Sequence, residues 1–215
     1  MAECPSRIGR IIRGEACVAE GAAWLVTCEP RFAVALAQTG PLPLRLREDG
    51  FGQLFSAIVS QQVSVASARA IWAKLEGAGM VTAEAIRATD HDGLRALGLS
   101  RQKATYAQAL AGAGIDFDGL RAMPTEEVIK TLVAVKGIGV WTAEIYAMFS
   151  LGRADVFAPG DLALQEAARL LFDLPDRPKE KALRQMAEAW SPWRSVAARA
   201  LWAYYHVEKS REGIA

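Results

Sequence analysis

The part of this chain that most constrains its fold is residues 132–161, where a tight glycine turn separates two helical segments. Thr125 is a residue type that begins helices, and Val128 and Leu132 follow it with helical spacing. The sequence Lys136-Gly137-Ile138-Gly139 then predicts a hairpin, because glycines can take positive φ and leave the backbone bare. The helix after such a turn opens with unpaired N–H groups, which form a site for an anion and above all for a phosphate.

The composition indicates a helical protein. Of the 215 residues 52 % are hydrophobic, alanine is abundant and β-branched runs are short, so the chain can bury a full core of packed helices. It has no run of 18 or more apolar residues and no signal-peptide pattern, so no membrane association is expected. Cys4, Cys17 and Cys28 lack metal-binding spacing and are expected as reduced thiols, which favours a cytoplasmic protein.

The net charge is only +1, from 25 Lys and Arg against 24 Asp and Glu, which argues against strong nonspecific binding of nucleic acid. A protein that acts on one base needs only a local basic face. Basic residues that could form such a face, or could equally be solvated surface, gather near both chain ends: Arg7, Arg10, Arg13, Arg194, Arg199, Lys209 and Arg211.

Two helical subdomains are expected, because the proline-containing segment 41–50 is typical of a connector. Residues 1–50 should pack with residues 159–215 as one discontinuous helical subdomain. Residues 51–158 should form a six-helix subdomain that carries the hairpin.

Several helix starts can be predicted from N-cap residues. Thr82, Asp90 and Ser100 should each begin a short helix. Ser191 is predicted as the N-cap of the last helix, with Pro192 at its first helical position.

A polar break, Gln61-Gln62-Val63-Ser64, separates two helices whose apolar residues repeat at three and four positions. By itself this break predicts only a loop. Together with the pattern Leu-x-x-Val-x-Gly-Ile-Gly-x-x-Thr-Ala of residues 132–143 and the Pro159-Gly160-Asp161 loop, it resembles the helix-hairpin-helix (HhH-GPD) DNA glycosylase superfamily. Within this superfamily the chain looks most like the 3-methyladenine (alkylpurine) DNA glycosylase branch, over roughly residues 50–205.

The resemblance implies an all-α fold in which two helical subdomains flank an active-site cleft, and a function in base excision repair of DNA. The expected partner is double-stranded DNA with damaged bases, bound by a monomer. Phosphate contacts are implied for Lys136, Gly137, Gly139, Val140 and Thr142 of the hairpin, and for Arg101 and Lys103 of a second turn, unless these last two are ordinary surface charge. Gln62, with Gln61 beside it, would enter the DNA stack and fill the gap left by an extruded base.

Asp161 is the expected catalytic residue. Cleavage of an N-glycosidic bond leaves positive charge on the sugar, and one carboxylate near the sugar can stabilise that charge and position or deprotonate water. We expect Asp161 in the first turn of a helix, where the helix dipole favours its negative charge. The same position would also suit a purely structural helix start.

The position two residues after Gly139 separates two classes of enzyme within the superfamily. Members that also nick the strand carry a lysine there, which forms a Schiff base with the sugar, whereas this chain has Trp141. The resemblance therefore predicts a monofunctional hydrolase that leaves an abasic site. Trp141 and Trp202 would stack on the flipped base, with Ile145 where some relatives have a pocket tyrosine. The core is the expected location of Trp24, Trp72 and Trp190.

No cofactor is expected to be required. The resemblance implies that the carbonyls of Val133, Val135 and Ile138 can hold a structural Na⁺ or K⁺. The cysteine placement rules out the iron–sulfur cluster of some relatives, and with only two histidines a catalytic transition metal is not expected.

Two alternatives stay open. A non-catalytic helix-hairpin-helix DNA-binding module would explain the hairpin but would leave Asp161, Gln61-Gln62 and the tryptophans without a role. A glycosylase for another lesion, such as hypoxanthine or uracil, would share the same motifs. A strand-nicking enzyme of the iron–sulfur type is opposed by Trp141.

Overall fold

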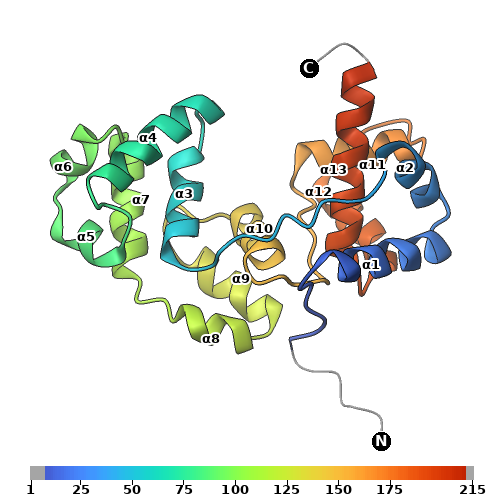
Figure 1. The fold of residues 1–215 in the computed structure, drawn as a ribbon, viewed down its shortest axis with the longest axis horizontal. Coiled ribbons are helices and arrows are strands. Elements are labelled where there is room, and N and C mark those ends of the chain that lie inside the picture. The colour runs from blue at the N-terminus through green and yellow to red at the C-terminus, as the bar shows by residue number, and fades with distance from the viewer. Residues whose placement is uncertain (1–7, 212–215) are drawn as a thin grey trace, which may run out of the picture. The chain divides into compact units, whose positions relative to one another are not determined.

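The computed structural model describes residues 8–211, and these residues confirm the predicted all-α class (Figure 1). They form thirteen α-helices and one short 3₁₀-helix. No strand occurs within residues 8–211, where a single antiparallel bridge joins Ile11 to Arg153. Gly152 has φ +66°, and a Cβ there would lie 2.6 Å from the Ile12 carbonyl oxygen, so the N-terminal arm needs glycine at this crossing.

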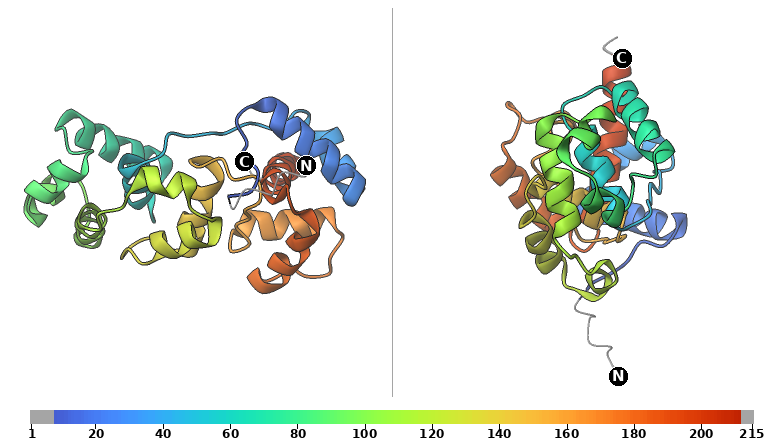
Figure 2. Two further views of the ribbon diagram at one scale, coloured as in Figure 1. Left: turned by 90° about the horizontal axis from the view of Figure 1, so that it is seen from below. Right: turned by 90° about the vertical axis from the view of Figure 1, so that its left-hand side faces the viewer.

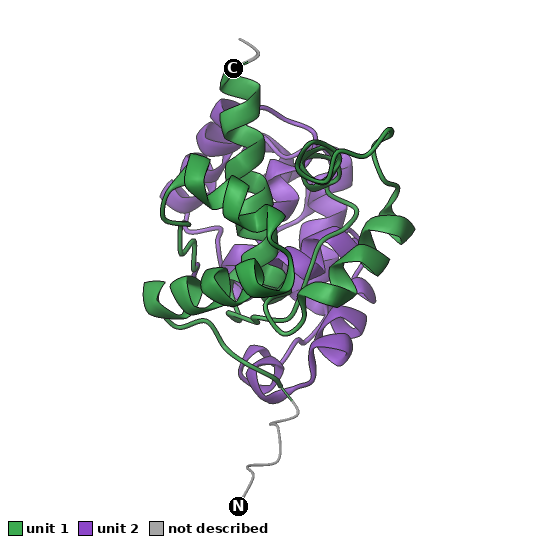
Figure 3. Ribbon diagram, turned by 90° about the vertical axis from the view of Figure 1, so that its right-hand side faces the viewer, with its two compact units in different colours: residues 1–46, 147–215 green, residues 47–146 purple. Residues whose placement is uncertain are grey.

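The chain forms two compact units (Figure 3). Unit 1 contains the described residues up to Leu46 and from Ala147 onward, and unit 2 contains residues 47–146. Both boundaries lie earlier in the chain than the predicted ones. The second boundary shifts because Phe149 packs on Trp202 of unit 1, and because residues 152–154 pair with the N-terminal arm.

Unit 1 is built around its last helix, α13, which Figure 2 shows almost end on with the other helices of this unit around it. α1 approaches α13 closely, since a Cβ on Gly21 would lie 2.7 Å from the Val196 side chain. An aromatic cluster completes the core, with the rings of Phe32 and Phe172 5.4 and 5.7 Å from Trp190. The helices of unit 1 are α1 (Glu15–Cys28), α2 (Arg31–Thr39), α11 (Leu162–Leu171), α12 (Glu180–Met186), η1 (Ala187–Trp190) and α13 (Arg194–Arg211).

The start of α13 corrects one prediction. The helix begins at Arg194, so Ser191 is not its N-cap and Pro192 is not its first helical residue. The Ser191 hydroxyl instead donates to Asp155 Oδ2 at 2.8 Å. Arg194 donates to both oxygens of the same carboxylate, at 2.6 and 3.0 Å. A side-chain ion pair to the loop after α10 therefore replaces the expected local cap.

Unit 2 carries more helices than predicted. The N-caps Thr82, Asp90 and Ser100 are confirmed, because each side chain accepts the backbone N–H three residues later. The number of six is wrong, because eight helices, α3 to α10, follow one another here. Among them α8, which follows its own N-cap Asp116, was not predicted. The helices are α3 (Phe51–Ser60), α4 (Val65–Gly77), α5 (Ala83–Ala88), α6 (His91–Ala96), α7 (Arg101–Gly112), α8 (Phe117–Ala122), α9 (Thr125–Val133) and α10 (Val140–Phe149), whose last turn belongs to unit 1.

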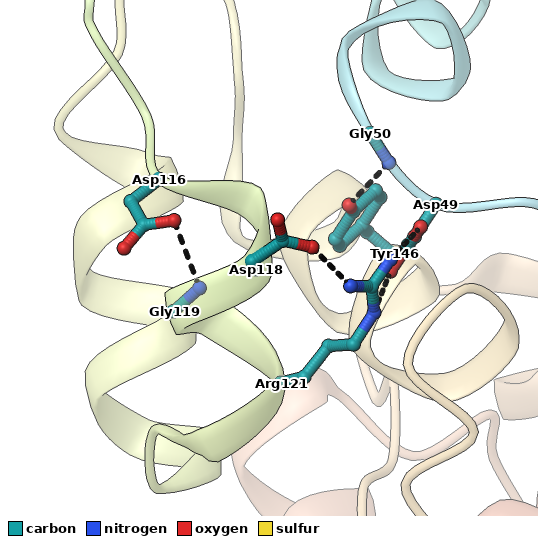
Figure 4. A network of polar contacts seen from close by, with 7 residues as sticks. All are labelled: Asp49, Gly50, Asp116, Asp118, Gly119, Arg121 and Tyr146. Atoms are coloured by element: carbon teal, nitrogen blue, oxygen red, sulfur yellow. Dashed lines mark hydrogen bonds and ion pairs between the residues drawn. The ribbon is translucent and has the colours of Figure 1, made fainter.

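The connector enters unit 2 through a network of polar contacts (Figure 4). Arg121 of α8 donates to both carboxylate oxygens of Asp49 at 2.7 Å and also contacts Asp118. The Gly50 N–H donates to the Tyr146 hydroxyl oxygen at 2.8 Å. Burial raises the pKa of Tyr146 to about 12, so this hydroxyl stays neutral at physiological pH. The end of the connector is thereby fixed to α8 and α10.

Among the helices of residues 8–211, none combines the length and the apolar character that a membrane crossing demands.

Candidate functional site

The glycine hairpin between α9 and α10 is present as predicted. α9 ends at Val133, the Ile138 N–H donates to the Val135 carbonyl at 3.0 Å, and α10 begins at Val140. Gly137 has φ +98°, and a Cβ there would lie 2.4 Å from the Tyr106 ring. The turn therefore needs glycine at 137 both for its backbone conformation and for its close packing on α7.

Gly139 differs from Gly137 in both respects. It does not have a left-handed φ, and a Cβ placed on it would meet no atom within 4 Å. The Ala143 N–H of α10 donates to the Gly139 carbonyl oxygen at 3.0 Å. The N–H groups of the first turn of a helix generally have no partner within the helix. The protein itself does not require the small residue at 139, which leaves bare backbone in front of these N–H groups.

The other hairpin residues predicted to contact phosphate differ in the exposure of their side chains. Lys136 and Val140 are exposed, as the prediction requires. The Thr142 side chain is buried, so only its backbone N–H suits the predicted contact.

The two glutamines of the polar break after α3 have different surroundings. Gln61 Nε2 donates to the Gly137 carbonyl oxygen at 3.0 Å, which ties the break to the hairpin. Gln62 is exposed and has φ +55°, a conformation that non-glycine residues rarely adopt outside constrained loops. Gln61 is therefore a support of the hairpin in this structure instead of a second intercalating side chain, and Gln62 alone keeps that predicted position.

Lys103 is not the surface cation that the sequence suggested. Its side chain is only 8 % exposed, and Nζ donates to the Val59 carbonyl near the C-terminus of α3 at 2.7 Å. Burial lowers the pKa of this ammonium group. The negative end of the α3 dipole explains why a buried lysine is tolerated there. Arg101, in the first turn of α7, is exposed and can still serve as the predicted contact.

These parts of unit 2 surround one concavity of about 360 Å³. It brings together the polar break, the N-terminus of α7 and the hairpin. Tyr106, which was not predicted from the sequence, packs its ring against Gly137. Its hydroxyl oxygen accepts a hydrogen bond from Gln102 Nε2 at 2.6 Å. The residues that line the concavity are Gln61, Gln62, Val63, Ser100, Gln102, Lys103, Tyr106 and Gly137.

In unit 1, Asp161 is the N-cap of α11 instead of a residue of its first turn. Its Oδ1 accepts the N–H groups of Ala163 at 2.9 Å and Leu164 at 3.0 Å. The same oxygen accepts the indole N–H of Trp202 at 3.2 Å. Two residues predicted for the site, Asp161 and Trp202, are thus in direct contact, and three donors fix the orientation of the carboxylate.

The loop before Asp161 is held by a residue that the sequence analysis missed. The Asp161 N–H donates to the Ala158 carbonyl at 3.0 Å and closes the Pro159-Gly160 turn. Gln165 is buried, and its Nε2 donates to the Pro159 carbonyl oxygen at 2.8 Å. A glutamine among the apolar positions of α11 was the available signal, because a buried amide requires a partner.

Trp141 and Ile145 lie one turn apart on α10 and therefore share a face of this helix. The Trp141 side chain is 47 % exposed, which is unusual for an indole and fits the prediction that it stacks on a base. Trp190 has the predicted core position, whereas Trp24 and Trp72 are only half-buried. Trp141 belongs to unit 2 and Asp161 to unit 1, so a cleft that joins them stays a prediction.

The carbonyl groups expected to hold a monovalent cation belong to α9 and the hairpin. Val133 is the last residue of α9, where the helix dipole is negative, and Val135 and Ile138 belong to the hairpin that follows. The carbonyl oxygens of all three residues are donors that suit Na⁺ or K⁺. These residues fit the ion, and its presence stays a prediction. In residues 8–211, no group of three or more His, Cys, Asp or Glu side chains is arranged to hold a metal.

The arginines near the chain ends mostly have partners within unit 1. Arg10 contacts Glu20, Arg194 contacts Asp155, and Arg211 contacts Glu208. Arg199 is fully buried. Burial excludes Arg199 from the local basic face that the sequence suggested, while Arg7 lies outside the described residues.

Comparison with known proteins relates this geometry to a family. Residues 55–192 match the profile of the HhH-GPD superfamily base excision DNA repair protein. DNA-3-methyladenine glycosylase 1 of Schizosaccharomyces pombe is 32 % identical over 165 residues, which cover 73 % of this chain and 72 % of that protein. DNA-3-methyladenine glycosylase 2 of Escherichia coli is 32 % identical over 168 residues, which cover 72 % of this chain and 57 % of that protein. This chain thus spans less than two thirds of the E. coli relative, and the match to a Bacillus subtilis relative covers 43 % of that protein.

Solved structures agree with these matches. The 3-methyladenine DNA glycosylase Mag1 of S. pombe, in complex with abasic DNA, superposes with a TM-score of 0.73 at 30 % identity. That match covers 85 % of this chain and 95 % of the Mag1 chain. The DNA-3-methyladenine glycosidase of Bacillus halodurans superposes with a TM-score of 0.78 at 31 % identity, over 91 % of this chain and 92 % of that one.

Proposed function

Because this chain belongs to the HhH-GPD superfamily of base excision DNA repair proteins, we propose that it is a monofunctional DNA glycosylase for alkylated purines. Its reaction would be hydrolysis of the N-glycosidic bond of a 3-methyladenine or 7-methylguanine type nucleotide in double-stranded DNA. The observation that carries the proposal is the Asp161 carboxylate, held at the start of α11 by the Trp202 indole and two backbone N–H groups. The relatives and solved structures named as 3-methyladenine DNA glycosylases support the same substrate class.

The proposed role of Asp161 follows from the chemistry of the leaving group. An alkylated purine is cationic and departs readily, so the enzyme mainly needs to stabilise positive charge on the sugar. Three donors to Oδ1 orient the carboxylate at the start of α11 before substrate binds. The carboxylate then stabilises an oxocarbenium-like state and positions water for attack on the sugar carbon.

The identity of residue 141 supports hydrolysis without strand cleavage. A Schiff base needs an amine at the sugar, and Trp141 has none. Its exposed indole suits stacking on a flipped methylated purine, because an electron-poor cation is attracted to the face of an indole ring. The product of this proposal is free base and an abasic site, and the S. pombe relative has been seen with abasic DNA.

The features of unit 2 support binding to the DNA backbone. The bare backbone at Gly139 and the open N-terminus of α10 suit a phosphate, with the exposed Lys136 beside them. Gln62, exposed and in a left-handed conformation at the end of the polar break, has the position to enter the base stack and keep the damaged base extruded.

The test is base release from methylated duplex DNA by wild-type protein and by Asp161→Asn. Asparagine is also a good N-cap, so this variant should fold normally and still bind damaged DNA. We expect wild type to release 3-methyladenine, 7-methylguanine or both, and Asp161→Asn to lose about a thousandfold in kcat. Near-wild-type rates in the variant would exclude Asp161 from the mechanism.

Two further measurements separate the alternatives. Borohydride should trap no covalent complex between the wild-type enzyme and DNA, and a trapped band would contradict the monofunctional assignment. If wild type releases no alkylated purine, duplexes with hypoxanthine and with uracil identify another lesion. Binding without release from any of these duplexes would favour a non-catalytic binding module.

A further inference from the structure

Arg199 of α13 is a buried cation without an anionic partner among the described residues. Arg199 is 0 % exposed, and the nearby α13 residues Val196, Ala200 and Leu201 are buried as well. Its hydrogen-bond partners are neutral. Nε and Nη2 donate to the Leu44 carbonyl at 3.2 and 3.0 Å, and Nη1 donates to the Ser195 carbonyl and hydroxyl oxygens at 2.9 and 3.1 Å. A methionine would fill such an apolar position without the desolvation penalty of a charge.

The Arg199 guanidinium also lies over the Phe149 ring, which contacts the Trp202 indole that donates to Asp161. Its Cζ lies 4.7 Å from the centroid of the Phe149 ring. The Phe149 and Trp202 ring centroids are 5.8 Å apart, with an interplanar angle of 33°. Trp202 in turn donates its indole N–H to Asp161 Oδ1 at 3.2 Å. Guanidinium, phenyl ring, indole and carboxylate therefore follow one another in contact, all within unit 1.

The charge of Arg199 has a physical effect at this position. Burial and, to a smaller extent, the positive charge of Arg45 together lower its pKa to about 10, so the group is still cationic at neutral pH. A cation over a phenyl ring attracts the face of the ring and opposes its rotation. The four hydrogen bonds to Leu44 and Ser195 hold the guanidinium itself in place. The Phe149 ring therefore contacts two groups, the fixed guanidinium and the Trp202 indole.

We propose that Arg199 is a positioning residue of the glycosylase site, which holds the Phe149 ring and, through it, the Trp202 indole on Asp161. The inference rests on the proposed function only in assigning the reaction to Asp161. The simpler alternative is that Arg199 anchors the connector through Leu44 and has no influence on Trp202.

The test uses Arg199→Met, Arg199→Lys, Phe149→Leu and the double variant Arg199→Met/Phe149→Leu in the full chain. The rate of alkylpurine release is measured under single-turnover and steady-state conditions. The ¹⁹F spectrum of protein labelled with 5-fluorotryptophan is recorded in parallel, with the Trp202 resonance assigned from Trp202→Phe. Arg211→Met, at the exposed end of the same helix, is the matched control.

We expect Arg199→Met to lower kcat about tenfold with KM changed less than about twofold, and to shift the Trp202 resonance. Arg199→Lys should restore part of the rate, and Arg211→Met should change neither rate nor spectrum. In the double variant, removal of Arg199 should lower kcat no further than Phe149→Leu alone, because both act through the same ring. Additive losses, or an unshifted Trp202 resonance, would overturn the proposal in favour of connector anchoring.

Phe149→Leu keeps the test decisive if Arg199→Met does not fold. This variant keeps every hydrogen bond of Arg199, so an unchanged kcat and an unchanged Trp202 resonance in it would also overturn the proposal. The fluorine spectrum does not depend on any activity. If wild type releases no alkylated purine, the proposed function fails, while the spectrum still decides whether Arg199 positions Trp202.

Discussion

The two units carry different kinds of proposed functional group. In unit 1 the proposed chemistry belongs to one side chain, Asp161, and a second side chain orients it, since Trp202 donates to its carboxylate. In unit 2 the contact surface is mainly backbone, presented by the hairpin, and the nearby side chains support it. Gln61 bonds to the Gly137 carbonyl, and Tyr106 packs against the same glycine.

This difference separates two kinds of sensitivity to substitution. A change at Asp161 or Trp202 alters the group that faces the reacting sugar, so its main effect should be on kcat. A change in the hairpin alters either the turn itself or the access of a phosphate to backbone N–H groups. Where an added side chain would clash with the protein, the main effect should be on stability. Where it would only obstruct a phosphate, the main effect should be on DNA affinity.

The largest expected effect on stability comes from Gly137→Ala. The new Cβ would lie 2.4 Å from the Tyr106 ring on a backbone with φ +98°, so we expect a loss of about 3 kcal/mol in the free energy of unfolding. Urea denaturation followed by circular dichroism measures it.

Gly139→Ala is the matched control, because its Cβ meets no protein atom within 4 Å. Its stability should stay within about 0.5 kcal/mol of wild type, and its affinity for duplex DNA should fall about tenfold as the methyl group blocks one charge-assisted hydrogen bond. Equal stability losses in the two variants would contradict the distinction between the glycines.

Trp202→Phe tests the side-chain contact of unit 1. It keeps an aromatic ring at this position, and it removes the indole N–H that donates to Asp161 Oδ1 together with one of the two fused rings. We expect kcat for alkylpurine release to fall about tenfold, with DNA affinity nearly unchanged. Single-turnover kinetics and fluorescence anisotropy measure the two quantities. A loss confined to affinity would show that Trp202 acts only as a wall of the base pocket.

The smallest effects should distinguish the two glutamines of the polar break. Gln61→Ala removes the hydrogen bond to the Gly137 carbonyl and should lower the free energy of unfolding by about 1 kcal/mol. Gln62→Ala should leave stability unchanged, because this side chain is exposed, and should raise KM for damaged duplex. Thermal unfolding and steady-state kinetics on both variants provide the comparison. The opposite pattern would return the intercalating role to Gln61.

Local patterns in the sequence were sufficient for much of the fold and for the hairpin of the proposed site. The all-α class follows from composition and spacing, and the caps at Thr82, Asp90 and Ser100 follow from side chains that bond to backbone three residues away. The hairpin follows from glycine spacing. These features are encoded within a few residues, so no knowledge of distant contacts is required.

Only the tertiary structure decided which polar side chains are exposed and which are used inside the protein. Lys103 and Arg199 belong to a residue class that is mostly exposed, yet one caps α3 and the other supports Phe149. Ser191 has the residue type of a helix cap but bonds to Asp155, far away in the sequence. The sequence by itself determined most of the helices and the glycine turn, and it singled out Asp161 as the candidate carboxylate. The partners of its buried cations and amides depended on chain segments that meet only after folding, and no local pattern contains that information.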